Sequence, residues 1–114
     1  METTISLEEA HALREECKKR IGIAKSLERL YHNTDFKKVF LENYLKEEAI
    51  RLVALMGDAV INERDDKDKY REDIKEQMIG IARTAEYMRC VFRIAEQAQK
   101  SLEDLAKAEH TNEN

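Results

Sequence analysis

The stretch IKEQMIGIARTAEYMRCVFRIAEQAQKSL, residues 74–102, decides the fold of this chain. Its apolar residues recur at alternating steps of four and three, which is the 3.5-residue period of a coiled-coil seam. One series consists of Met78, Ala85, Phe92 and Gln99, and the other of Ile74, Ile81, Met88, Ala95 and Leu102. The pattern predicts a long C-terminal helix with an apolar stripe along one side.

The stripe is wider than the seam of a two-stranded coiled coil. Four further apolar residues extend it, namely Ala82, Val91, Ala98 and Leu105. This width is typical of a helix that packs against two neighbours in a bundle. A helix over about 66–108 would span roughly 60 Å at 1.5 Å per residue, which is longer than either partner helix can cover. Leftover apolar surface is normally buried by another copy or another protein, so we expect a homo-oligomer.

Contacts with protein partners are expected to come from this long helix. Polar Gln99 in the seam, and small Ala85 and Ala95, can fix the register between helices. The residues expected to make the contacts are Ile74, Met78, Ile81, Ala85, Met88, Val91, Phe92, Ala98, Leu102 and Leu105, with Ile94 beside them on the second face.

An N-terminal helix is expected over about 6–32. Ser6-Leu7-Glu8-Glu9 has the form of a capping box, in which the serine hydroxyl satisfies a free amide at the helix start. Apolar residues at three- and four-residue steps continue from there to Tyr31. Gly22 interrupts this helix, and it either permits a close helix contact or lowers local stability.

A second helix is expected over 34–56. Asn33 or Thr34 is the candidate N-cap, and Gly57 is a natural C-terminal stop. Residues 59–61 either dock as a short turn or extend the helix. The expected apolar face consists of Phe36, Val39, Phe40, Tyr44, Ile50, Leu52, Val53 and Met56.

The chain is therefore expected to be all-α, as a three-helix antiparallel bundle with a long C-terminal coiled-coil-like helix. Its 114 residues fit a single domain spanning 1–114. It has no proline and only three glycines, so strands and tight hairpins are hard to place. The expected helices span about 6–32, 34–56 and 66–108.

The charge pattern argues against nucleic acid and membranes as partners. Charged residues make up 39% of the chain and the net charge is −4, with acids and bases interleaved, so no basic face stands out for nucleic acid. No apolar run approaches the roughly 20 residues of a membrane span, and residues 1–6 lack the features of a secretory signal. We expect an intracellular protein.

No cluster of residues in the sequence indicates a particular reaction, so we expect neither a catalytic site nor a bound metal or cofactor. Glu8-x-x-His11 is a single motif, whereas di-iron bundles need two such motifs and two more glutamates. Glu63-x-x-Asp66 and Asp73-x-x-Glu76 resemble the acidic pairs with which all-α nucleotide pyrophosphatases hold magnesium. They fall in or beside the charged stretch 62–71, which is expected to be a solvated connection.

The two cysteines, Cys17 and Cys90, lie on different expected helices without CxxC spacing. The plain interpretation is a reduced pair of small, buried side chains. A disulfide or a reactive thiol is the alternative.

The stretch LERLYHNTDFKKVFLENYLKEEAIRLV, residues 27–53, resembles a pattern in small uncharacterised proteins of tailed bacteriophages. There a leucine-rich helix is followed by Asn-x-Asp-Phe, a tyrosine and Glu-Ala-x-Arg-Leu. The resemblance covers about a quarter of the chain. The matching positions are Asn33, Asp35, Phe36, Tyr44, Glu48, Ala49, Arg51 and Leu52.

Such phage proteins are often encoded beside portal, capsid or scaffold genes, so the resemblance implies a role in the virion or its assembly. Localisation in the host cytoplasm or the virion would follow. We therefore expect a non-enzymatic protein–protein interaction protein, a small structural or assembly component of a tailed phage. The alternatives are a host-directed phage inhibitor, whose acidic surface would occupy basic sites on a host protein, and a magnesium-dependent nucleotide hydrolase.

Overall fold

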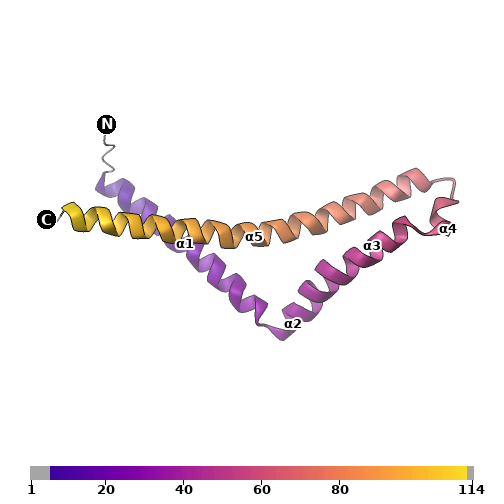
Figure 1. Cartoon of the computed structure of the whole chain (residues 1–114), viewed down its shortest axis with the longest axis horizontal. Helices are drawn as coiled ribbons and strands as arrows, with labels where there is room; N and C mark the ends of the chain where they lie inside the picture. Colours follow the sequence, from indigo (N-terminus) through magenta and orange to yellow (C-terminus); the bar gives the residue numbers. More distant parts are fainter. Residues whose placement is uncertain (1–5, 113–114) are drawn as a thin grey trace. The chain divides into compact units, whose positions relative to one another are not determined.

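The computed structural model describes residues 6–112 of the chain, and these residues form helices joined by short turns, with no strand among them (Figure 1). The predictions of an all-α chain and of a long C-terminal helix are confirmed. The elements are α1 (Leu7–Tyr31), α2 (Thr34–Phe36), η1 (Lys37–Glu48), α3 (Ala49–Met56), α4 (Ala59–Asn62) and α5 (Lys67–Asn112).

The start of α1 follows from its capping residue. The Ser6 hydroxyl oxygen accepts a hydrogen bond from the backbone N–H of Glu9 at 3.1 Å, as the capping-box pattern predicts. Glu8 and Glu9 lie in the first turn, where a negative charge favours the positive end of the helix dipole.

The segment from Thr34 to Met56 is helical throughout but is not a uniform α-helix. Asn33 is its N-cap, because its side-chain oxygen accepts a hydrogen bond from the N–H of Phe36 at 2.9 Å. Between the α-helical turns α2 and α3 lies the π-helix η1, in which the hydrogen bonds run to the fifth residue. The predicted range 34–56 is therefore one continuous helical segment, with π rather than α hydrogen bonding in its middle part.

The structure shows whether residues 59–61 extend the second helix or form a separate turn. α3 ends at Met56 with Gly57 as its C-cap, as predicted. Asp58 then caps the short helix α4, in which Ile61 is buried. Residues 59–61 therefore dock as a separate turn of helix rather than extending α3.

The chain packs as two units, and α5 contributes to both. Unit 2 is the hairpin formed by residues 29–88, in which η1 and α3 pair with the first half of α5. Its core is formed by Leu52 of α3 and by Ile74 and Ile81 of α5. Half-buried side chains surround that core, including Tyr44, Leu45, Ala49, Leu55, Met56, Tyr70 and Met78.

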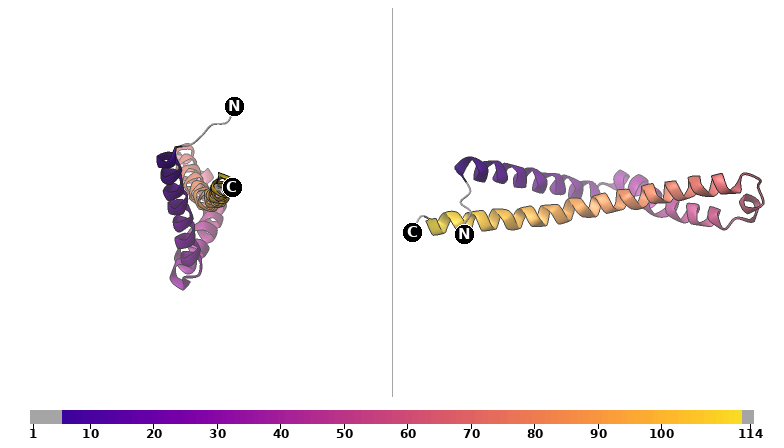
Figure 2. Two further views of the ribbon diagram at one scale, coloured as in Figure 1. Left: turned by 90° about the vertical axis from the view of Figure 1, so that its left-hand side faces the viewer. Right: turned by 90° about the horizontal axis from the view of Figure 1, so that it is seen from above.

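Unit 1 combines residues up to 28 with residues from 89 onward. Here α1 runs antiparallel to the second half of α5 (Figure 2), and Arg14 forms an ion pair with Glu109. Among the side chains of this unit that the structure describes, the buried ones are small: Cys17 and Ala24 on α1, and Ala98 on α5. The prediction that the chain forms one domain stays a prediction.

Candidate interaction surface

The predicted contact residues of the stripe on α5 are buried or half-buried. Ile74, Ile81, Met88 and Ala98 are buried, and the other six predicted contact residues (Met78, Ala85, Val91, Phe92, Leu102 and Leu105) are half-buried. Ile74 and Ile81 complete the core of unit 2, so their burial needs no second molecule. Contact of the stripe with a partner protein stays a prediction.

Large apolar side chains are exposed elsewhere, mainly in unit 2. Three of them belong to the expected apolar face of the second helix, yet Val39, Ile50 and Val53 are 64%, 56% and 58% exposed. Ile79 and Tyr87 of α5 are 50% and 65% exposed. The predicted apolar face of residues 34–56 is therefore only partly buried, and sequence reasoning missed the outward position of these three residues.

Helical periodicity shows on which side of the hairpin these residues lie. At 3.6 residues per turn, the residues before and after a core-facing position point to opposite sides of the helix. Arg51 precedes the core residue Leu52, whereas Val53 follows it. On α5, Ala82 follows the core residue Ile81. Because the two helices run antiparallel, the residues that follow a core position lie on the same side of the hairpin.

We call this side the apolar flank and define it by Ile50, Val53, Ile79 and Ala82. All four side chains are exposed. Val53 and Ala82 lie nearest the seam between the helices, whereas Ile50 and Ile79 lie further out. The flank therefore presents aliphatic side chains from both helices of unit 2.

The opposite flank of unit 2 is polar. Two hollows open there beside Leu52, and each is lined partly by polar residues, which are Glu48, Arg51, Asp73 and Gln77. Arg51 Nε donates a hydrogen bond to Glu48 Oε2 at 3.0 Å, which lowers the pKa of Glu48 and raises that of Arg51. The two sides of the hairpin thus differ in chemistry.

Unit 1 has a groove of its own between α1 and α5. Its apolar lining residues are Ile21, Ala24, Phe92 and Ala95, and its charged or polar lining residues are Lys25, Glu28, Glu96 and Gln99. Small Ala24 and Ala95 leave the space, because larger side chains at these two positions would fill it. A hole framed by residues of paired helices is the shape that accepts a side chain from a third helix.

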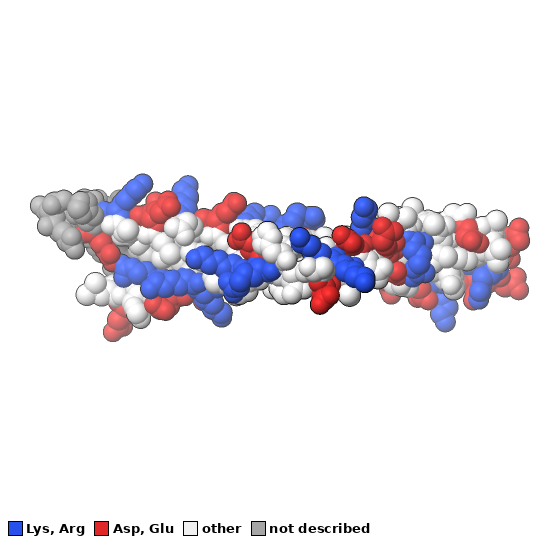
Figure 3. Space-filling model, turned by 90° about the horizontal axis from the view of Figure 1, so that it is seen from below, with Lys and Arg blue, Asp and Glu red and all other residues white. Residues whose placement is uncertain are grey.

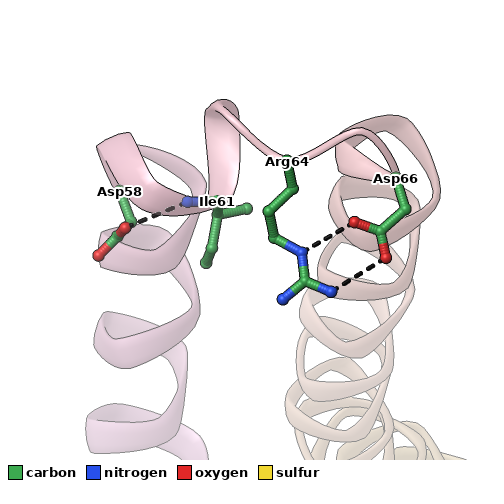
Figure 4. Close-up of polar contacts among 4 residues, drawn as sticks. All are labelled: Asp58, Ile61, Arg64 and Asp66. Atoms are coloured by element: carbon green, nitrogen blue, oxygen red, sulfur yellow. Dashed lines mark hydrogen bonds and ion pairs between the residues drawn. The ribbon is translucent and has the colours of Figure 1, made fainter.

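The turn between α3 and α5 is held by specific polar contacts (Figure 4). Asp58 accepts hydrogen bonds from the N–H groups of Val60 and Ile61 at 2.8 and 3.3 Å. Arg64 donates two hydrogen bonds to Asp66 at 2.8 and 3.0 Å. These contacts fix the direction in which the chain enters α5.

Arg71 joins this turn from inside α5. Its Nη1 donates to the carbonyl oxygen of Met56 at 2.9 Å and to Asn62 Oδ1 at 2.8 Å. The charged stretch 62–71 includes both the connection and the first residues of α5, which begins at Lys67, one residue after the predicted start of the C-terminal helix. Arg71, the last residue of this stretch, is half-buried and helps to hold the turn.

The acidic residues considered for magnesium do not come together. Glu63, Asp66, Asp73 and Glu76 are all exposed, and Asp66 is held by Arg64. Among the residues that the structure describes, no three His, Cys, Asp or Glu side chains form a group able to hold a metal ion. A magnesium site needs converging oxygen ligands, and this arrangement gives that chemistry no support.

The cysteines and the surface charges do not form a further candidate functional site among the residues that the structure describes. Cys17 is buried and Cys90 is half-buried, and the two cysteines do not form a disulfide. Arg93 donates a hydrogen bond to Cys90 Sγ at 2.9 Å. Acidic and basic side chains are interspersed over the face in Figure 3. Within residues 6–112, no helix is long and apolar enough to cross a membrane.

Comparisons with known proteins gave no identification. Neither protein-family models, nor curated proteins, nor solved structures gave a match to this chain. The candidate site therefore rests on its physical features, which are an apolar flank in unit 2 and an apolar groove in unit 1.

Proposed function

We propose that this chain is a non-enzymatic protein–protein interaction protein that forms a homo-oligomer through the apolar flank of unit 2. The observation that carries the proposal is the exposure of Ile50, Val53 and Ile79, each half or more exposed, on a hairpin whose core cluster contains only three buried residues. A helix pair with so small a core gains stability when a further helix covers its apolar side.

The three-helix antiparallel bundle expected from the chain's own helices stays a prediction, and here we propose a related arrangement in which a third helix covers that flank. Two paired helices leave a seam between them, and a third helix lying in the seam would bury Val53 and Ala82 first. We propose that another copy of the chain supplies this helix. The polar flank, with its Glu48–Arg51 ion pair, would then remain in solvent.

The resemblance of residues 27–53 to small phage proteins supports a narrower version of the proposal, in which the oligomer is a structural or assembly component of a tailed phage. Detection of the protein in purified virions by mass spectrometry would support that version. Detection only in the lysate of infected cells would contradict a place in the virion and favour a host-directed inhibitor.

Light scattering coupled to size-exclusion chromatography tests the oligomer directly. The wild-type chain is expected to elute as an oligomer, and Val53→Glu is expected to shift it to the monomer, because a buried, unpaired carboxylate is costly. Circular dichroism of the variant should show unchanged helix content, since Val53 is 58% exposed within the chain.

Val60→Glu is the matched control for this experiment. Val60 is 72% exposed, but it lies on α4 outside the apolar flank, so this variant should remain oligomeric. A monomeric wild-type protein would overturn the proposal. Equal effects of the two substitutions would show that the interface does not lie on the flank.

A further inference from the structure

The π-helix η1 is unusually long. It spans 12 residues, Lys37–Glu48, whereas π-helical hydrogen bonding is mostly confined to single turns within α-helices. The flanking residues Phe36 and Ala49 have ordinary α-helical backbone angles, with φ of −61° at both. The helix therefore passes from α to π and back to α without a break in the backbone (Figure 1).

A ladder of aromatic rings runs along η1. The Phe36 and Phe40 rings stack with centroids 5.0 Å apart and planes 20° apart, and Phe40 and Tyr44 follow at 5.4 Å and 34°. Tyr31, at the end of α1, adds a ring 6.2 Å from Phe36. The three rings from Phe36 to Tyr44 are spaced four residues apart in the sequence.

The spacing of the rings suits a π-helix better than an α-helix. In an α-helix, residues four apart are separated by about 6 Å along the axis. Consecutive Cα atoms are always about 3.8 Å apart, so a wider helix advances less per residue and brings such residues closer together. A π-helix therefore favours close stacking of these rings, whose centroids lie 5.0 and 5.4 Å apart.

The two ends of η1 are held differently. At the C-terminal end, Tyr44 and Leu45 pack against the core formed by Leu52, Ile74 and Ile81. At the N-terminal end, residues 37–39 are exposed, and no residue of η1 is fully buried. A change in helical register would therefore leave the C-terminal end in place and turn the N-terminal end.

We propose that η1 is a register switch, in which the Phe36–Phe40–Tyr44 ladder stabilises the wide i→i+5 form and its loss lets the helix tighten to the i→i+4 form. Tightening rotates residues 34–40 relative to the fixed core and changes the direction in which exposed Val39 points. Small translations and rotations of helices are an established way for a protein to pass between two packed states. The proposal does not depend on the interaction function proposed above.

NMR scalar couplings across hydrogen bonds test the switch, because they connect each amide to the carbonyl that accepts its proton. In the wild-type protein, amides in η1 should couple to carbonyls five residues earlier. Phe40→Leu removes the central ring but keeps an apolar side chain of high helix propensity. In this variant the i→i+5 couplings should be lost and replaced by i→i+4 couplings.

Val39→Leu is the matched control, because it changes the neighbouring exposed residue without touching a ring, and it should retain the i→i+5 couplings. Phe36→Leu removes the contacts with Tyr31 and Phe40 but keeps the Phe40–Tyr44 contact, and it serves as the second variant if Phe40→Leu does not fold. Couplings to the fourth residue in the wild-type protein would overturn the proposal. It would also be overturned if i→i+5 couplings survived in the folded ring variants.

Discussion

At the scale of single residues, the glycine inside α1 is the simplest case. A Cβ atom added at Gly22 would meet no heavy atom within 4 Å beyond its own helical backbone, so Gly22 does not permit a close helix contact. Of the two explanations that the sequence leaves open, only the loss of local stability agrees with this geometry. Gly22 therefore weakens α1 through its conformational freedom.

Gly22→Ala should raise the free energy of unfolding by about 1 kcal/mol, which is the difference in helix propensity between glycine and alanine. Urea unfolding followed by circular dichroism measures this change. Gly57→Ala is the control, because Gly57 caps α3 rather than lying inside a helix, and it should change stability much less. A fall in stability for Gly22→Ala would reveal a contact that needs the glycine.

Arg71 is a residue whose role the sequence does not reveal. In the printed sequence it ends a run of charged residues, which gives no sign of the carbonyl and amide oxygens that it reaches at Met56 and Asn62. These acceptors lie 15 and 9 residues away along the chain. Only the packing of the hairpin brings them together.

Arg71→Met keeps the aliphatic part of the side chain and removes both hydrogen bonds. We expect it to lower the free energy of unfolding by about 1.5 kcal/mol, the lower end of the range for hydrogen bonds to charged groups, because Arg71 is only half-buried. Arg83→Met, at an exposed position further along α5, should change stability by less than about 0.5 kcal/mol. Thermal unfolding of both variants compares them, and equal losses would contradict a specific role for Arg71.

At the scale of elements, the turn between α4 and α5 should respond to pH. Two hydrogen bonds from Arg64 lower the pKa of Asp66 from its ordinary value. A lowered pKa in the folded state means a stabilising contribution that is complete above the ordinary aspartate pKa, about 3.9, and is lost as the pH falls through the lowered value. Asp66 is exposed, so the contribution is small.

Asp66→Asn should therefore reduce the loss of stability that the wild-type protein shows on acidification below about pH 4. Urea unfolding at neutral and acid pH measures that difference. Asp65→Asn is the control, because the preceding aspartate accepts neither hydrogen bond from Arg64. If both variants gave the wild-type pH dependence, the Arg64–Asp66 pair would contribute nothing to stability.

Most helix boundaries follow from local signals in the sequence. Ser6, Asn33 and Gly57 act as the caps that their residue types predict. The π-helical hydrogen bonding of η1 has no such signal. Phe36, Phe40 and Tyr44 are four apart in sequence, and that spacing places them on one side of either kind of helix.

At the scale of the whole molecule, the sequence predicts which residues are apolar but not which of them stay exposed. Val53 and Leu52 are both aliphatic and adjacent, yet they are 58% and 1% exposed. The difference is decided by which side of α3 faces α5. In the sequence, the apolar residues of this segment spread over a broad face of the helix, so their spacing does not show which of them become buried. The candidate flank could therefore be found only from the packed hairpin.

The Arg14–Glu109 pair has a consequence for how the molecule comes to be folded. Almost the whole chain separates these two residues, whereas the partners in the core of unit 2 are much closer in sequence. Bringing distant segments together costs more loop-closure entropy than forming a local hairpin, and it slows folding. The unit 2 hairpin should therefore form first. Once formed, it lowers the loop-closure entropy that pairing α1 with the second half of α5 costs. A substitution that destabilises the hairpin should therefore delay this pairing.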